Sequence, residues 1–286
     1  MMDHILVCPF NEKLLSRLKQ RAVVINTKDF NIIRYINKEL DNSNKLHAIR
    51  VQTDKPLSEI HFHEEWGKIP LAVYSPEFGE FKNLLHQLNL IRKLNIRIFL
   101  SSQHEFNFTG LRILSSLQIA CGLYFNEEPH NWDSINDLMH YAIYTNTTHA
   151  PIEPFHWVAI NYQPSEYTDY SFVYFNNPTQ YLHLNDQEQI ALTAEDLAKG
   201  NFIDQGIKSL DSIHKNKKYI HAENVRYEIM LQMNDCSFCQ AFRICLAKFS
   251  SLKNKNQTCK IFFSDFLNAA DFALSKRNKG NQLWQL

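Results

Sequence analysis

Four of the six cysteines lie near the end of the chain, at Cys236, Cys239, Cys245 and Cys259. Two thiolates separated by two residues can bind one centre, and the third and fourth can complete a tetrahedral shell of four sulfur atoms. Iron–sulfur clusters and structural zinc both accept this shell, and the spacing does not choose between them. The alternative is four reduced cysteines buried as small apolar side chains. Disulfides rank below both, because nothing in the sequence marks an oxidising compartment.

The length and composition are those of a globular protein. With 286 residues and 44% hydrophobic content, the chain can bury a sizeable core. Residues 1–15 contain only a short apolar stretch, and no run approaches the length of a membrane span. We therefore expect a cytoplasmic protein without a membrane partner, whose thiols are reduced or bound to metal.

The charge is balanced overall but unevenly distributed. Residues 201–286 hold 13 Lys and Arg against 7 Asp and Glu, so the cysteine-bearing end is basic. Cations can offset the negative charge of a thiolate-bound centre, and they also permit an acidic partner, with Lys215, Lys217 and Lys218 as candidate contacts. The net charge of zero and the lack of interleaved aromatic and basic residues argue against nucleic acid.

Glycine is too sparse for the common nucleotide-binding loops. The chain has seven glycines, and no two are closer than six residues. A G-x-G-x-x-G turn and a Walker A loop both need closely spaced glycines, because backbone amides must approach the phosphates. The sequence therefore excludes both motifs, and it also lacks a paired-glycine strand end that could contact a nucleoside cofactor.

The elements that must position the cysteines follow a repeating pattern from about residue 45. Short apolar runs predict strands, and amphipathic stretches between them predict helices. This alternation indicates a parallel sheet, here an incomplete (β/α) barrel of about four to six strands. The strands are expected at 46–52, 70–75, 96–101 and 121–125, and the helices at 80–94, 110–117 and 133–144.

Three segments are expected along the chain. Residues 1–44 form a leader unit with an apolar stretch and one helix, 45–160 form the partial barrel, and 161–286 form the cysteine-bearing module. Aromatic content predicts two further strands, and a polar turn between apolar runs predicts a β-hairpin. Those strands are placed at 155–162 and 170–176, the hairpin at 181–184 with 190–193, a helix after Thr193, and an amphipathic helix at 260–274.

The C-x2-C-x5-C run, the later Cys259, the hairpin and the final amphipathic helix together resemble the SPASM or twitch region of radical SAM peptide and protein maturases. The resemblance implies that Cys236, Cys239, Cys245 and Cys259 hold one auxiliary [4Fe–4S] cluster, with the hairpin packed nearby. A full SPASM region carries further cysteines for a second cluster. Here Phe249 stands at one of those positions, so at most one cluster is implied.

The chain departs from the radical SAM pattern upstream. The C-x3-C-x2-C motif that holds the SAM-cleaving cluster is missing, and Cys8 and Cys121 stand alone. Reductive cleavage of S-adenosylmethionine is therefore not expected. The chain is similar to the SPASM-domain proteins that accompany ATP-grasp ligases in grasp-with-spasm peptide systems. This resemblance implies an α/β fold, with an incomplete barrel of radical-SAM type followed by a SPASM-like iron–sulfur module.

The function implied by this resemblance is a component of a ribosomal peptide maturation system. Such a component carries one auxiliary cluster and binds a precursor peptide or its ATP-grasp-type modifying enzyme, without cleaving SAM. The residues leave two alternatives open. One is a zinc-stabilised protein-interaction module, and the other is a redox enzyme that uses the single cluster.

Three other groups of residues invite a chemical interpretation. His61 and His63, followed by Glu64 and Glu65, contain metal-ligating types, but they lie in a loop-like context that favours a solvated role. Charged residues near predicted strand ends can line a pocket with a general acid or base, although such residues are also ordinary in loops. They are His104, Glu105, Glu127, Glu128 and His130. The tyrosine-rich stretch 162–181 is expected to pack a sheet or bind a peptide at its edge.

Overall fold

The computed structural model describes residues 4–18, 20–39, 45–67, 69–125, 130–221, 236–246 and 258–279, with Asn224, Glu228 and Lys248. Its strands alternate with helices over most of this length, as expected for an α/β protein. The strands are β1 (Ile5–Pro9), β2 (Ala22–Thr27), β3 (Lys45–Gln52), β4 (Leu71–Ser75), β5 (Ile96–Ser101), β6 (Cys121–Tyr124), β7 (Ile152–Glu153), β8 (Tyr181–Leu184), β9 (Gln189–Ala191) and β10 (Asp204–Gln205).

Helices follow most of these strands. They include several single-turn 3-10 helices, marked η, which connect the longer elements. The α-helices are α1 (Glu12–Arg17), α2 (Asn31–Glu39), α3 (Phe81–Leu84), α4 (Leu88–Lys93), α5 (Glu105–Ser116), α6 (Trp132–Tyr144), α7 (Phe155–Asn161), α8 (Ala194–Lys199), α10 (Phe242–Cys245) and α11 (Thr258–Asn278). The 3-10 helices are η1 (Leu57–Glu59), η2 (Glu64–Trp66), η3 (Leu85–Gln87), η4 (Tyr170–Tyr174) and η5 (Ile207–Lys215).

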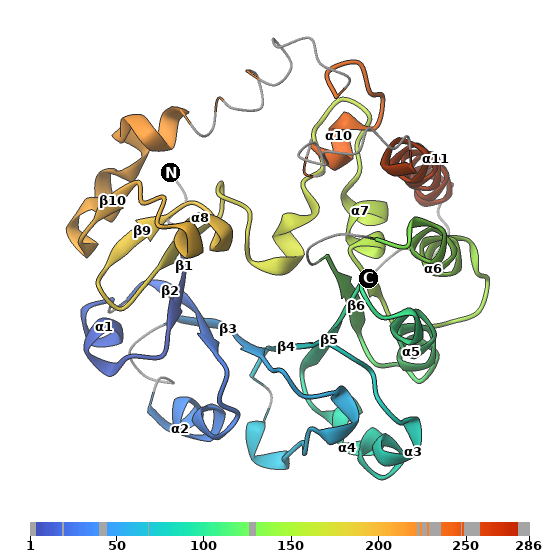
Figure 1. Cartoon of the computed structure of the whole chain (residues 1–286), viewed down its shortest axis with the longest axis horizontal. Helices are drawn as coiled ribbons and strands as arrows, with labels where there is room; N and C mark the ends of the chain where they lie inside the picture. The colour runs from blue at the N-terminus through green and yellow to red at the C-terminus, as the bar shows by residue number, and fades with distance from the viewer. Residues whose placement is uncertain are drawn as a thin grey trace. The chain divides into compact units, whose positions relative to one another are not determined.

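The ten strands form one sheet in the order β10-β9-β8-β1-β2-β3-β4-β5-β6-β7 (Figure 1). The register pairs show parallel neighbours from β8 through β4 and between β6 and β7, and antiparallel pairs only for β8–β9 and β9–β10. The α/β class predicted from the sequence is therefore confirmed. Whether the sheet belongs to a radical-SAM-type barrel, and whether a SPASM-like module follows it, stay predictions.

The chain is divided into two compact units. Unit 1 consists of Met1–Phe99 and Tyr174–Glu223, and unit 2 of Leu100–Val173 and Asn224–Leu286. The expected leader segment supplies β1 and β2, and β2 pairs with β3 over six positions. The sheet thus begins at Ile5 and not near residue 45. The short apolar run at Ile5–Pro9 is buried up to Cys8, as an interior parallel strand requires.

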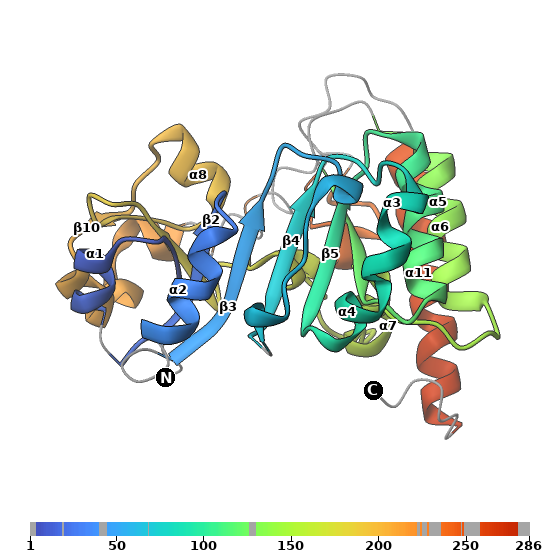
Figure 2. The same ribbon diagram turned by 90° about the horizontal axis from the view of Figure 1, so that it is seen from below.

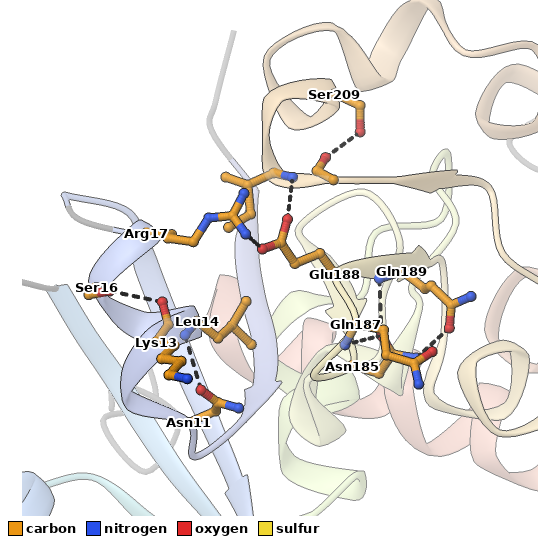
Figure 3. A network of polar contacts seen from close by, with 12 residues as sticks. Asn11, Lys13, Leu14, Ser16, Arg17, Asn185, Gln187, Glu188, Gln189 and Ser209 are labelled. Atoms are coloured by element: carbon orange, nitrogen blue, oxygen red, sulfur yellow. Dashed lines mark hydrogen bonds and ion pairs between the residues drawn. The ribbon is translucent and has the colours of Figure 1, made fainter.

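A polar network fixes the β8–β9 hairpin of unit 1 (Figure 3). In the turn, the side-chain oxygen of Asn185 accepts hydrogen bonds from the backbone N–H groups of Gln187 and Gln189, both at 3.0 Å. Glu188 adopts a left-handed conformation at φ 60° and forms an ion pair with Arg17 of α1. The hairpin predicted from the sequence is confirmed, and it is tied to the first helix as well as to β1.

Unit 2 is organised around the long helix α11, which lies beside α6 and contacts α7 (Figure 2). Phe262 packs against Trp132 of α6 with ring centroids 5.2 Å apart, and Phe266 packs edge-on against Phe155 of α7 at 5.5 Å. The three phenylalanine rings are among the most buried side chains in the described part of the chain, whereas Trp132 is half-buried. The amphipathic helix expected at 260–274 is confirmed, although its Ile261 is exposed rather than packed.

Two predicted strands are wrong. Residues 155–162 contain α7, and residues 170–176 contain η4. Phe155, Val158 and Ala159 are fully buried at the spacing of one helix face, a period that their aromatic and β-branched content had masked. In the second segment the side chain of Asp169 accepts hydrogen bonds from the backbone and hydroxyl of Ser171, which bends the chain into a turn.

Candidate metal centre

Three of the four predicted ligands lie on one short turn followed by one helical turn. The backbone N–H of Cys239 donates to the carbonyl of Cys236 at 3.2 Å, and that of Phe242 donates to the carbonyl of Cys239 at 3.0 Å. Cys245 is the last residue of α10, which ends at Leu246 in a left-handed conformation. The spacing C-x2-C-x5-C therefore corresponds to a tight turn and the helix that it begins.

The fourth predicted ligand, Cys259, lies on the first turn of α11. Helices α10 and α11 contact each other within unit 2, and Figure 1 shows them side by side. Because α11 is held by buried aromatic contacts with α6 and α7, the position of Cys259 is fixed by the core of the unit. Cys245 and Cys259 therefore lie on two helices in contact, and Cys236 and Cys239 lie on the turn that leads into the first of them.

The exposure of the cysteines separates these four from the remaining two. Cys236, Cys239, Cys245 and Cys259 are each half-buried thiols, whereas Cys8 and Cys121 are fully buried in β1 and β6. Burial raises the pKa of the Cys8 thiol to about 12, with Asp186 adding to the effect. A thiol that resists ionisation in this way is a poor ligand, since metals bind the thiolate.

The cysteine-bearing turn is anchored to residues 164–171 by a set of polar contacts. The backbone N–H of Thr168 donates to the carbonyl of Arg243 at 2.8 Å, and the Arg243 guanidinium donates to the carbonyl of Pro164 at 2.6 Å. Lys248 forms an ion pair with Asp169, whose side chain is only 6% exposed. These contacts hold α10 and the lysine that follows it against residues 164–169.

The Asp169–Lys248 pair also has an aromatic neighbour. The ammonium of Lys248 lies 3.9 Å from the centroid of the Tyr170 ring, a cation–π distance. Burial raises the pKa of Asp169, but Lys248 and the hydrogen bonds from Ser171 outweigh this effect and hold the pKa below its usual value. Asp169 is therefore ionised near neutral pH, and its charge is compensated by the lysine that follows Cys245 by three residues.

The donor chemistry of the four cysteines fits a thiolate-bound metal group. Four sulfur donors suit tetrahedral zinc or an iron–sulfur cluster, and half-buried thiols can be approached by metal while excluding most water. Cys236 additionally packs on Phe242 and Leu246, which gives the turn an apolar base. Among the residues that the structure describes, no three His, Cys, Asp or Glu side chains are already gathered closely enough to hold a metal ion.

The other candidate residues belong to other elements of the fold. His61 and His63 are exposed and flank the buried Phe62, and Glu65 forms an ion pair with Arg34 at 3.0 Å. Glu105 accepts hydrogen bonds from Asn131 and Ser134, which ties α5 to the start of α6. Glu65 and Glu105 therefore have structural partners of their own. Glu127 and Glu128 lie outside the described residues.

His130 is brought to the end of β5, as its position after β6 suggested. Its Nδ1 lies 3.2 Å from the hydroxyl of Ser102, and Phe125 and Trp132 pack edge-on against its ring. Burial lowers the pKa of His130, so the imidazole is neutral near pH 7. Ser102 is only 1% exposed, whereas His130 is half-buried, so the histidine packs over a buried hydroxyl in unit 2.

Asp169, Lys248 and Arg243 were not singled out by the sequence. Asp169 and Lys248 are 79 positions apart. The local signal in the aromatic stretch 162–181 is its two acidic residues, Glu166 and Asp169, of which Asp169 is the buried one. A buried carboxylate needs a cation, and the basic excess of residues 201–286 was the available indication of where that cation lies.

Comparisons of the chain with protein-family models, with curated protein sequences and with solved structures found no match. In the described part of the chain, no helix is both long enough and apolar enough to cross a membrane.

Proposed function

We propose that this protein is a SPASM-type component of a ribosomal peptide maturation system. In this proposal Cys236, Cys239, Cys245 and Cys259 hold one auxiliary [4Fe–4S] cluster, and the protein binds a precursor peptide or the ATP-grasp-type enzyme that modifies it. The observation that carries the proposal is the arrangement of four half-buried thiols on α11, on α10, which contacts α11, and on the turn that leads into α10.

Two further features support a thiolate-bound centre in unit 2. Arg243 and Lys248 flank Cys245 and place positive charge beside thiols that must ionise to bind metal. Their hydrogen bonds to Pro164 and Asp169 hold the turn, so that metal binding has less chain entropy to overcome. A [4Fe–4S] cluster, when bound, supplies one-electron transfer, and these residues act on it by fixing the turn and offsetting its charge.

Partner binding is assigned to surfaces rather than to a catalytic pocket. Lys215, Lys217 and Lys218 are exposed around the end of η5 and offer a basic surface on unit 1. Such a surface accelerates and strengthens association with an acidic peptide or protein at low salt. The proposal that this partner belongs to a peptide maturation system is based on the resemblance of the cysteine run to SPASM regions.

The absence of SAM chemistry is directly testable. Reduced protein incubated with S-adenosylmethionine is expected to yield no 5′-deoxyadenosine above the background, because the chain has no C-x3-C-x2-C motif to hold a SAM-cleaving cluster. The measurement is chromatography of the quenched mixture, with the Cys239→Ser variant treated in the same way as the control. Production of 5′-deoxyadenosine that depends on the wild-type protein would overturn this part of the proposal.

A further inference from the structure

One face of the unit 1 sheet carries an arginine, Arg50, that forms no ion pair with any described residue. Arg50 lies near the carboxyl end of β3, in register with Asn26 of β2 and Ala72 of β4. Its guanidinium is 4.5 Å from the centroid of the Tyr74 ring, and its Nε is buried without a hydrogen-bond partner. No hydrogen bond or ion pair joins Arg50 to another residue in the described part of the chain. A half-buried arginine normally has such a partner.

A second unpartnered group lies on the same face. His183 of β8 is in register with Val7 of β1, and Val7 is in register with Val24 of β2. Val24 is in register with Ala48 of β3, which precedes Arg50 by two residues. Successive strand residues alternate between faces, so His183 and Arg50 share one. His183 is only 3% exposed, and its Nε2 is the one buried histidine nitrogen without a hydrogen-bond partner among the described residues.

The ionisation state of His183 determines what its free nitrogen can do. Burial lowers the pKa of His183 to about 4, and Arg50 contributes to the lowering, so the imidazole is neutral near pH 7. The backbone of Phe175, itself in a left-handed conformation at φ 56°, makes the ring's other hydrogen bond. With Nδ1–H directed at that carbonyl, Nε2 is left as an acceptor lone pair.

The surroundings are aromatic with one nearby carboxylate. Tyr74 stacks on Phe99 with centroids 4.6 Å apart, and Tyr174 packs on Phe99 at 5.6 Å. Glu195 acts electrostatically on His183, and its own carboxylate is held by the side chain of Asn176 at 2.9 Å. The face therefore combines the Arg50 guanidinium, the hydrogen-bond acceptor Nε2 of His183, the exposed carboxylate of Glu195 and aromatic rings. These groups lie at the strand ends where parallel sheets bind ligands.

We propose that this face of unit 1 binds a ligand with a carboxylate beside an N–H donor, as in an α-amino acid or the carboxyl-terminal residue of a peptide. The carboxylate takes the terminal nitrogens of Arg50, which are not among the buried atoms. The guanidinium then moves outward, and the ligand N–H reaches His183 Nε2. Glu195 receives the additional charge of a free ammonium group. This site uses none of the cysteines and is independent of the cluster.

The test is calorimetric titration of the full-length protein with three related probes. L-Phenylalanine and N-acetyl-L-phenylalanine both carry the carboxylate and the N–H, and at least one should bind. L-Phenylalaninamide lacks the carboxylate and should not. Tighter binding of L-phenylalanine would identify a free amino acid as the ligand, and its affinity should then depend on Glu195. Tighter binding of the acetylated probe would identify the carboxyl terminus of a peptide.

The Arg50→Met variant keeps an unbranched apolar side chain beside Tyr74 but removes the guanidinium, and it should weaken binding at least about tenfold, as loss of a charged hydrogen bond predicts. Arg112→Met is the matched control, because Arg112 also has an unpartnered Nε and lies 5.7 Å from the Tyr141 ring, but in unit 2. A second readout needs no variant: the Nε2 resonance of 15N-histidine-labelled protein should shift on binding, since that nitrogen gains a hydrogen bond.

Three results would overturn the proposal. The first is an absence of heat and of resonance shifts with both carboxylate probes at millimolar concentration, which would mean that only water meets these groups. The second is equal affinity in Arg50→Met and wild type. The third is binding of inorganic phosphate, in an Arg50-dependent manner, by a protein that binds neither carboxylate probe.

Discussion

The Cys239→Ser variant is expected to lose most of its bound metal and to unfold at a lower temperature than the wild type. Cys239 closes the turn that begins at Cys236, and a serine hydroxyl is a weak ligand for zinc or iron at neutral pH. Because metal binding to such a site contributes directly to folding free energy, metal content and thermal stability should fall together. The measurements are metal analysis of anaerobically purified protein and thermal unfolding.

Cys8→Ala is the control for this comparison. Cys8 is fully buried in β1 of unit 1, and the raised pKa of its thiol keeps it protonated. The control should therefore retain the metal content of the wild type per folded molecule. Full metal retention in Cys239→Ser, or its loss in Cys8→Ala, would show that the ligand assignment is wrong.

Replacing Lys248 by Met is expected to lower the free energy of unfolding of unit 2 by about 2–3 kcal/mol at pH 7. The methionine keeps an unbranched apolar side chain beside Tyr170 but removes the ammonium that lies over the ring, and it leaves the buried carboxylate of Asp169 without its cation. Removing one partner of a buried pair typically costs about 3–5 kcal/mol, and the 26% exposure of the Lys248 side chain reduces the effect. Urea unfolding followed by tryptophan fluorescence measures it, since Trp132 packs on α11.

The effect of Lys248→Met has a predictable pH dependence. In the wild type the pKa of Asp169 is lower in the folded than in the unfolded chain. The unfolded chain therefore takes up the proton first as pH falls, and the stability that this carboxylate contributes is lost below its unfolded value of about 3.9. The difference in free energy of unfolding between wild type and variant should therefore be largest near neutral pH and should shrink as the pH is lowered.

Lys82→Met is the matched control for Lys248→Met. Lys82 forms an ion pair with Glu80 at 3.1 Å, but both side chains are well exposed, so its replacement should leave the unfolding midpoint unchanged. Equal effects of the two lysine replacements would contradict the assignment of Lys248 as the residue that holds the cysteine-bearing turn. So would a loss of stability at Lys248 that persists unchanged at low pH.

The sequence predicted the elements whose local pattern is strong. Strands β3, β4, β5 and β6, the hairpin of β8 and β9, and α11 all follow from short apolar runs or helical periodicity. The segments 155–162 and 170–176 were misassigned because aromatic residues suit strands and packed helices alike. At Phe155 and Val158 the three-residue spacing was the better guide.

The parts of the sites that depend on long-range contacts were not visible in the sequence. The cysteine run could be identified because its ligand types and spacing are local. Asp169 and Lys248 meet only through the fold of unit 2, and Arg50 and His183 only through the register of β8, β1, β2 and β3. For Arg50 and His183 the one local signal is a charged or titratable residue inside a strand, which marks a position but not its partner.

The measurement that tests the central claim most directly is iron, acid-labile sulfide and zinc analysis of protein purified without oxygen, together with its absorption spectrum. A four-thiolate cluster predicts about four iron and four sulfide per chain and a broad brown absorption band, both lost on replacement of Cys239. Colourless protein with one zinc per chain would contradict the cluster and support a zinc-stabilised interaction module in its place. Protein free of iron and zinc whose cysteine variants keep full stability would contradict a metal centre of either kind.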